Sequence, residues 1–250
     1  MIDPEPISAS GPGLAGPAVA AQLWQEATFL HWRVPDAAVA PLLPPGVRPD
    51  AFDGSSWVGL IAFRLARARF GPLPPVPHFG TFTEVNVRLY GVDGRGRRGV
   101  VFRSLEASRL AAVLVARTVF ALPYRWATTD QRERDGVVGY RSRRIRTGER
   151  CELEVRPDRG MPVTDDDLAA FLTARWALFT AGPTPLARRR GRTRWMPNTH
   201  EPWPLHRAEL VRLQDDLVAA AGLPGVAARP PDSVLYSRGV AARFGLPESL

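Results

Sequence analysis

Hydrophobic and polar residues alternate most regularly over residues 82–92, FTEVNVRLYGV, which predicts a β-strand with two different faces. Successive side chains of a strand point to opposite faces. One predicted face carries aliphatic side chains, those of Val85, Val87 and Leu89. The other face carries the polar groups of Glu84, Asn86, Arg88 and Tyr90. The aliphatic face belongs in a hydrophobic core, and the polar face needs its own explanation.

Similar patterns predict strands along most of the chain, with a few helices between them. The other predicted strands span residues 24–34, 57–70, 100–105, 124–129, 137–146, 151–156, 192–199, 208–213 and 234–244. The predicted helices are a short one at 37–46 capped by Asp36, one at 107–122, one at 165–179 capped by Thr164 or Asp165, and one at 215–221. Loops are predicted at 71–80, 93–99 and 181–191. This order indicates the α+β class, with a large antiparallel sheet that is curled or closed.

The first 20 residues differ in composition from the rest of the chain. They are rich in Pro and Gly, and we expect residues 1–20 to form a disordered tail. Residues 21–250 contain no internal repeat and no linker, so we expect a single domain there. The start of the chain lacks the basic and apolar regions of a signal peptide. No apolar run approaches the roughly 18 residues of a membrane span, so we expect a cytoplasmic protein without a membrane partner.

All 33 basic residues are arginines, and the formal net charge is +8 at pH 7. A basic protein can bind nucleic acid, and the arginines are densest at 141–146 and 188–194. No aromatic residue interrupts the first cluster, so a platform for stacking bases is not evident and we do not expect nucleic-acid binding. The lack of lysine excludes Schiff-base catalysis and a Walker-type phosphate loop.

No motif for a metal or another cofactor stands out. The four histidines lack the spacing of metal ligands, and Cys151 is the only cysteine. Two segments, 11–16 and 94–99, match G-x-G-x-x-G. Neither lies between a predicted strand and a predicted helix, as a dinucleotide-binding loop would. We therefore expect no cofactor, no metal and no intramolecular disulfide.

The polar face of the strand at 82–92 has two interpretations. It is either a solvent-exposed face, as is normal in antiparallel sheets, or the inside of a curled sheet around a ligand. The combination of Tyr and Asn with an acid and a base favours the second. His31 lies among aromatic residues and is interpreted mainly as a core histidine. The segment HEPWPLH, which begins at His200, either lines a pocket or packs a loop against the domain.

Seven segments, in order from about residue 22 to 247, resemble the uncharacterised bacterial YqjF-like family. They are FLHWRVPDAAVAPLLPPGVRPDAFDGSSWVGLIAF, FTEVNVRLY, GVVFRSLEA, LPYRWA, FLTARWALF, HEPWPL and SRGVAARFG. This family is in turn similar to acetoacetate decarboxylase. The resemblance implies an antiparallel, cone-like closed sheet with an internal cavity and two or three flanking helices.

The resemblance also implies site residues. The segment FTE is similar to the decarboxylase segment with a cavity glutamate, which corresponds to Glu84. ARTVFALPYRWA is similar to the segment with the reactive lysine and its neighbouring lysine, which correspond to Tyr124 and Arg125. A second cavity glutamate would lie on the strand WVGLIAF, which has no acid, and a cavity arginine would lie near Gln25. The cavity is therefore expected to remain, without the imine chemistry.

Two functions fit these residues best. The first is binding of a small carboxylate- or carbonyl-containing molecule, held by Arg88 or Arg125. Asn86 and Tyr124 would orient it. The second is a lysine-independent enolisation, hydration or decarboxylation of a small keto or hydroxy acid. In it Glu84 is the general base, Tyr124 the acid or hydrogen-bond donor, and Arg125 stabilises the oxyanion. The further candidate ligand-binding residues are Tyr90, His31, Arg103 and His200. A protein-interaction role and a homo-oligomeric state stay open.

Overall fold

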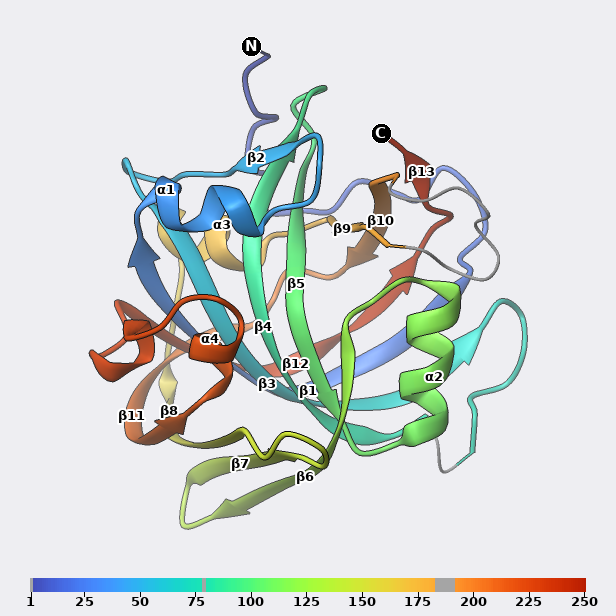
Figure 1. Cartoon of the computed structure of the whole chain (residues 1–250). Helices are drawn as coiled ribbons and strands as arrows, with labels where there is room; N and C mark the ends of the chain where they lie inside the picture. Colours follow the sequence, from blue (N-terminus) through green and yellow to red (C-terminus); the bar gives the residue numbers. More distant parts are fainter. Residues whose placement is uncertain (1, 78–79, 183–191) are drawn as a thin grey trace.

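The computed structural model describes residues 2–77, 80–182 and 192–250, and most of them form strands (Figure 1). The long strands are β1 (Ala20–Val34), β3 (Ser56–Phe70), β4 (Phe82–Asp93), β5 (Arg98–Ala107), β6 (Tyr124–Arg134), β7 (Val137–Arg144), β8 (Arg150–Pro162), β11 (Leu205–Asp215) and β12 (Ser233–Phe244). The shorter strands are β2 (Val47–Pro49), β9 (Ala177–Thr180), β10 (Arg194–His200) and β13 (Glu248–Ser249). The helices are α1 (Asp36–Val39), α2 (Leu110–Val119), α3 (Asp167–Thr173) and α4 (Leu217–Ala220), with 3-10 turns η1 (Ala40–Leu42) and η2 (Val226–Ala228).

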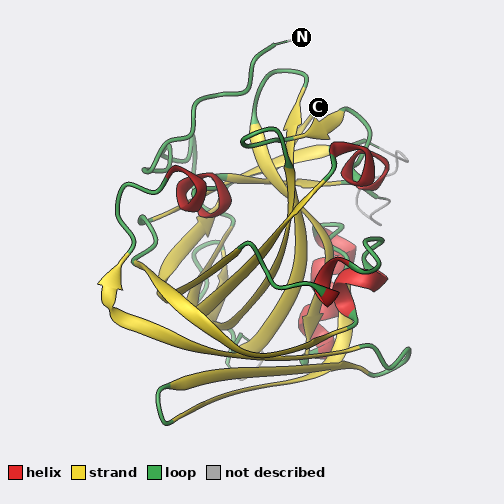
Figure 2. Ribbon diagram, turned by 90° about the vertical axis from the view of Figure 1, so that its left-hand side faces the viewer, coloured by secondary structure: helices red, strands yellow, loops and turns green. Residues whose placement is uncertain are grey.

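The strands form one strongly curled sheet whose pairings return on themselves (Figure 2). Strands β12, β1, β3, β4 and β5 lie side by side in that order. From β5, one path of pairings leads through β6, β7, β8 and β11 back to β12. A second path leads through β9 and β10 back to β12. Among the described strands the pairs are antiparallel, except that β5 is parallel to both β6 and β9.

Both paths include strands β12, β1, β3, β4 and β5, which we call the shared strands. The two faces of the shared strands have different surroundings. On one face, Val85, Val87 and Leu89 of β4 are fully buried in a hydrophobic cluster with Tyr140 of β7 and Leu153 of β8. The helix α4 contributes to the same cluster. The polar side chains of β4 lie on the opposite face, toward β9 and β10, where the structure contains a cavity. The alternation in the sequence therefore predicts both faces of β4.

Two predicted helices differ from the observed elements. The helix predicted at 165–179 ends at Thr173, and residues 177–180 form β9, because this short apolar run is buried as a strand between β5 and β10. The N-cap of this helix is Asp166 rather than the predicted Thr164 or Asp165. The Asp166 carboxylate accepts a hydrogen bond from the backbone N–H of Ala169 at 2.8 Å.

The first helix is shorter than predicted, and Asp36 is its first residue rather than its cap. Pro35 occupies the cap position, and the Asp36 carboxylate accepts a hydrogen bond from Ser56 Oγ at 2.6 Å. The acid therefore joins the start of α1 to the start of β3.

The segment before β1 has no regular secondary structure, and some of its residues form hydrogen bonds with the rest of the domain. The Glu5 N–H donates to Gly96 O at 2.9 Å, and Trp176 Nε1 donates to Ser8 O at 3.0 Å. Most of the predicted loop at 181–191, including Arg188–Arg190, lies outside the described residues, as does His78. Within the described residues, no helix is long and apolar enough to cross a membrane.

Candidate functional site

A cavity of about 90 Å³ lies against the polar face of β4, and we call it the inner cavity. Its walls come from the shared strands and from β6, β9 and β10. The C-terminal end of α3, the residue Arg175 after it and the loop after β10 complete them. The lining residues are Gln22, Trp24, Phe29, Ile61, Phe63, Glu84, Asn86, Arg88, Val100, Phe102, Leu105, Leu122, Tyr124, Thr173, Arg175, Leu178, Asn198, His200, Trp203 and Phe244. The polar side chains of β4, together with Arg175 after α3, thus face walls that are mainly apolar and aromatic.

Glu84 and Tyr124 meet at the inner cavity. The Tyr124 hydroxyl donates to Glu84 Oε2 at 2.6 Å, and Asn86 Nδ2 donates to Glu84 Oε1 at 3.1 Å. Tyr124 begins β6, which is parallel to β5, and its side chain reaches Glu84 of β4 across the intervening strand. The register of β3 and β4 places apolar Phe63 beside Glu84, so no second acid is present there.

Glu84 is buried and has no cationic hydrogen-bond partner among the described residues. Burial raises the pKa of Glu84 from 4.5 to about 7, although the hydrogen bonds from Tyr124 and Asn86 oppose this change. Burial and the nearby Glu84 raise the pKa of Tyr124 well above its usual value, so the phenol keeps its proton. Glu84 therefore exchanges its proton near neutral pH while Tyr124 remains a donor.

Arg88 is held by neutral groups at the edge of the inner cavity. Its Nε donates to the Tyr90 hydroxyl at 3.0 Å, and its Nη2 donates to Leu172 O at 2.9 Å. Tyr90 also bonds with Leu172 O at 3.1 Å and with His31 Nε2 at 2.7 Å. One assignment satisfies all of these contacts: Tyr90 donates to Leu172 and accepts from Arg88 and from a neutral His31 protonated on Nε2. No described residue forms an ion pair with Arg88.

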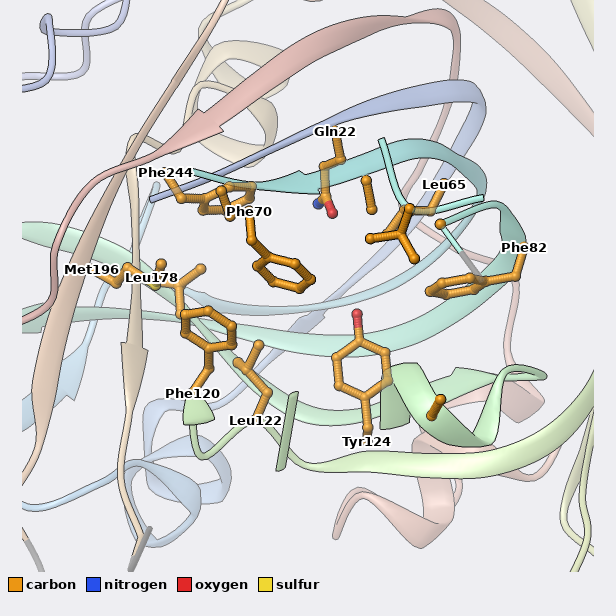
Figure 3. A pocket seen from close by; sticks show the side chains of 15 residues that line it. Gln22, Leu65, Phe70, Phe82, Phe120, Leu122, Tyr124, Leu178, Met196 and Phe244 are labelled. Atoms are coloured by element: carbon orange, nitrogen blue, oxygen red, sulfur yellow. The ribbon is translucent and has the colours of Figure 1, made fainter. Parts of the chain in front are cut away.

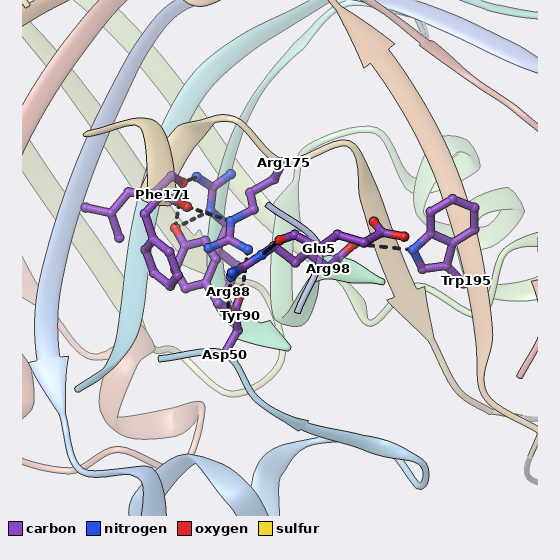
Figure 4. Close-up of polar contacts among 9 residues, drawn as sticks. Glu5, Asp50, Arg88, Tyr90, Arg98, Phe171, Arg175 and Trp195 are labelled. Atoms are coloured by element: carbon purple, nitrogen blue, oxygen red, sulfur yellow. Dashed lines mark hydrogen bonds and ion pairs between the residues drawn. The ribbon is translucent and has the colours of Figure 1, made fainter. Parts of the chain in front are cut away.

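A second guanidinium, that of Arg175, is buried beside the partly buried Arg88 (Figure 4). Its Nε donates to Phe171 O at 2.6 Å, and its Nη1 pairs with Asp50. Asp50 also pairs with Arg98, so one carboxylate is shared by two cations. The Nη2 of Arg175 is buried without a hydrogen-bond partner. Together these groups leave a net positive charge next to the inner cavity.

Aromatic rings and a neutral histidine form another part of the cavity wall. Trp24 stacks on Trp203 with ring centroids 5.6 Å apart, and the ring of His200 lies 5.7 Å from that of Trp24. Burial lowers the pKa of His200 to about 4, so its ring is neutral at pH 7. His200 Nδ1 contacts Glu201 O at 2.6 Å and must be the protonated nitrogen, which leaves Nε2 as an acceptor. The HEPWPL segment therefore lines the pocket.

A second cavity of about 250 Å³ adjoins the first, and we call it the outer cavity (Figure 3). Its lining residues are Ala20, Gln22, Leu65, Ala68, Phe70, Val76, Gly80, Phe82, Ala111, Phe120, Leu122, Tyr124, Leu178, Met196 and Phe244. Five of them also line the inner cavity, namely Gln22, Leu122, Tyr124, Leu178 and Phe244. The two cavities therefore share a wall.

The structure brings together Glu84, Asn86, Arg88, Tyr124 and His200 of the residues expected at the site. His31 and Tyr90 lie behind Arg88 and support it without lining the cavity. His31 is fully buried, and a Cβ on Gly59 would lie 3.0 Å from its ring, so this glycine leaves room for the imidazole.

Two predicted site residues, Arg125 and Arg103, point away from the cavity. Arg125 is exposed, because Tyr124 points inward and the next residue of a strand must point outward. Arg103 donates to Ala221 O at 3.1 Å and to Leu42 O at 2.9 Å, and so joins β5 to segments beside α4 and η1. Gln25, where the family resemblance implied a cavity arginine, is also exposed.

Several lining residues were not expected from the sequence, among them Gln22, Trp24 and Arg175. Arg175 had a usable signal, because it is a single charge within the apolar run FLTARWALF, and charged residues are rarely buried without a partner or a function. Gln22 and Trp24 had none, since they lie in the irregular first part of β1, where Glu26 has a positive φ of 50°. Within the described residues, no group of His, Cys, Asp and Glu is arranged to hold a metal ion.

Comparison with known proteins identifies the family. The model of DUF2071, a family of uncharacterised conserved proteins, matches residues 21–241. This chain belongs to that family. It is 32% identical over 190 residues to the uncharacterised protein YqjF of Bacillus subtilis (strain 168), which covers 75% of each chain. The relationship confirms the family suggested by the seven sequence segments.

Solved structures confirm the acetoacetate decarboxylase-like fold. An acetoacetate decarboxylase-like enzyme from Sphingomonas wittichii RW1 superposes with a TM-score of 0.66 at 15% identity and covers 93% of both chains. Acetoacetate decarboxylase from Legionella pneumophila gives 0.65 at 12% identity, covering 100% of this chain and 92% of that one. The enduracididine biosynthesis enzyme MppR gives 0.63 at 16% identity, covering 95% and 98%. At these identities the likeness concerns the fold alone.

Proposed function

We propose that this protein binds a small carboxylate of the oxo-acid class in the inner cavity. The observation that carries the proposal is Arg88, a guanidinium that lines the cavity and has only neutral hydrogen-bond partners among the described residues. Arg175 adds a buried nitrogen, Nη2, without a partner. Guanidinium groups match the planar geometry of a carboxylate, which would supply the missing charge and acceptors.

The charges around the cavity support an anionic ligand. His31 and His200 are neutral, and Glu84 is at least partly protonated at pH 7. Asp50 is already shared by Arg98 and Arg175. An anion would therefore find attraction from the two guanidinium groups and little opposing negative charge.

A structural neighbour supports the choice of an oxo acid. MppR was solved in complex with the condensation product of pyruvate and imidazole 4-carboxaldehyde and, separately, with pyruvate. In the present chain, Asn86 Oδ1 is buried without a partner, and Trp24 Nε1 is a buried unpaired donor at the cavity wall. The donor could serve a ligand carbonyl, and the amide oxygen a ligand hydroxyl or enol.

Calorimetric titration with pyruvate and acetoacetate tests this proposal. We expect Arg88→Gln to weaken binding by roughly 10- to 100-fold, since a hydrogen bond to a charged group contributes about 1.5–3 kcal/mol. The matched control is Arg125→Gln, which removes a charge outside the cavity and should leave the affinity unchanged. Failure of both acids to bind, or equal binding by Arg88→Gln and wild type, would refute the proposal.

A second candidate function, enolisation of the bound acid, is favoured by the Glu84–Tyr124 pair. A carboxylate whose pKa is about 7 is suited to proton transfer at neutral pH. Glu84 would take a proton from the carbon beside the carbonyl, and the C–H electron pair would become the enolate double bond. A guanidinium or Tyr124 would stabilise the oxyanion, and the proton would then return to carbon.

Hydrogen exchange separates enolisation from simple binding. In D₂O, wild-type protein should replace the carbon-bound hydrogens of pyruvate with deuterium, as followed by proton NMR, at a rate above that of buffer alone. Glu84→Gln should abolish this acceleration, because an amide cannot accept the proton. If wild type accelerates no exchange while pyruvate still binds, the protein is a binder and the catalytic candidate is wrong.

A further inference from the structure

We infer that the ligand of the inner cavity carries an apolar tail that lies in the outer cavity, which makes it a medium-chain carboxylic or oxo acid. This inference rests on the proposed function, since it takes the carboxylate at Arg88 as given. It adds a substrate class that the inner cavity alone does not specify. Its basis is the size, polarity and position of the outer cavity.

The outer cavity is almost wholly apolar. Among the described residues that line it, only Gln22 and Tyr124 have polar side chains, and both belong to the wall shared with the inner cavity. In Figure 3 the Gln22 amide and the Tyr124 hydroxyl point into the space from opposite sides. The polarity therefore increases from the outer cavity toward the Glu84 and Arg88 groups of the inner one. An amphipathic acid has the same gradient.

Small side chains leave the outer cavity unfilled. Ala20 of β1, Ala68 of β3 and Ala111 of α2 line it where larger apolar residues would close it. Its other walls are large and apolar, including Leu65, Phe82 and Met196, so the space is not suited to holding water. Burial of apolar chain in such a space is favourable by about 0.8 kcal/mol for each methylene, or roughly fourfold in affinity.

Two aromatic side chains mark a route from solvent. Phe70 at the end of β3 and Phe120 after α2 both line the outer cavity, and their rings stack with centroids 6.3 Å apart. Phe70 is 38% exposed, so this end of the cavity reaches the surface. A ligand that entered here would pass the Phe70–Phe120 pair before its carboxylate reached Arg88.

Calorimetric titration with straight-chain acids from acetate to octanoate tests the inference. We expect wild type to bind each longer acid about fourfold more tightly per added methylene until the outer cavity is full. Ala111→Trp should fill part of the cavity and remove this gain without changing the affinity for acetate. Ala68→Phe, on β3, should have the same effect and guards against a folding defect in α2.

The matched control is Leu114→Trp, which places the same side chain at an exposed α2 position that does not line either cavity. It should retain the full dependence on chain length. If pyruvate or acetoacetate binds but the affinity of the straight-chain acids does not rise with chain length, the tail inference is wrong and the proposed function stands. If octanoate binds Arg88→Gln as tightly as wild type, the tail binds without the carboxylate anchor, and the inference is also wrong. Failure of every acid to bind refutes both.

Discussion

Two buried glutamates on neighbouring strands differ in the charge of their hydrogen-bond donors. Glu106 of β5 accepts from Arg144 Nε at 2.9 Å and from Arg144 Nη2 at 2.7 Å, so it is part of a buried ion pair. Glu84 of β4 accepts from a phenol and an amide, both neutral. A buried carboxylate that accepts two hydrogen bonds from one cation has a structural explanation. A buried carboxyl with neutral donors beside a cavity can change its protonation and contact a ligand.

The difference follows the two faces of the shared strands. The face that carries Val85, Val87 and Leu89 is closed by β7, β8 and α4, and its side chains fill the space. The face that carries Glu84 is only partly filled by β9 and β10, and two cavities remain. The same alternation along β4 thus supplies a hydrophobic core on one side and a cavity with polar groups on the other.

The largest effect is expected from breaking the ion pair. Glu106→Ala would remove the carboxylate that accepts two Arg144 hydrogen bonds and leave only the more exposed Glu149, 3.4 Å from Arg144 Nη1, as an ion-pair partner, which costs about 3–5 kcal/mol of unfolding free energy. For a chain of this size the melting temperature should fall by on the order of 10 °C. Chemical denaturation and calorimetry measure both quantities.

A double variant checks the cause of that loss. Glu106→Ala combined with Arg144→Met removes both charges and replaces the cation with an apolar side chain, so much of the stability should return. If the double variant is as unstable as Glu106→Ala alone, packing rather than the broken ion pair explains the loss.

The sequence predicts the architecture better than it predicts the site. Alternation on residues 82–92 predicts both faces of β4, because the period of a strand does not depend on its neighbours. Family resemblance suggested Glu84 and Tyr124 as cavity residues but not that they meet, and the strand register explains their contact. Arg125 and Arg103 were wrong as cavity residues, because their direction depends on the strand phase after Pro123 and on contacts with distant loops. Arg175 was missed because a helix was predicted through β9.

An intermediate effect is expected from Glu84→Gln, and it should depend on pH. Because burial raises the pKa of Glu84 to about 7 in the folded protein, the folded state retains a proton that the unfolded chain loses near 4.5. Wild-type stability should therefore fall as pH rises through this window. The glutamine removes this loss, so the variant should gain on the order of 3 kcal/mol relative to wild type above pH 8 and little near pH 4.

The local hydrogen bonds can adapt to this substitution. A glutamine oxygen can still accept from Tyr124, and the unpartnered Oδ1 of Asn86 can turn to accept from the new amide N–H. Urea denaturation at pH 4, 6 and 8 measures the difference. Glu209→Gln, at an exposed position, is the control and should show no such pH dependence. A gain that is equal at all three pH values would contradict the raised pKa of Glu84.

The smallest effect is expected from Arg125→Gln, which tests whether a charge outside the cavity influences Glu84. The family resemblance assigns this position to a cation beside the reactive centre, whereas the structure exposes it to solvent. Loss of a single exposed charge should change the unfolding free energy by less than about 0.5 kcal/mol. It should also leave intact the pH-dependent difference in stability between wild type and Glu84→Gln, because water screens a charge on the outer face of β6 from a buried carboxyl. The double variant Glu84→Gln, Arg125→Gln, denatured at pH 4 and 8, measures this coupling. A coupling above about 1 kcal/mol would mean that Arg125 acts on the cavity and that its outward direction does not describe its role.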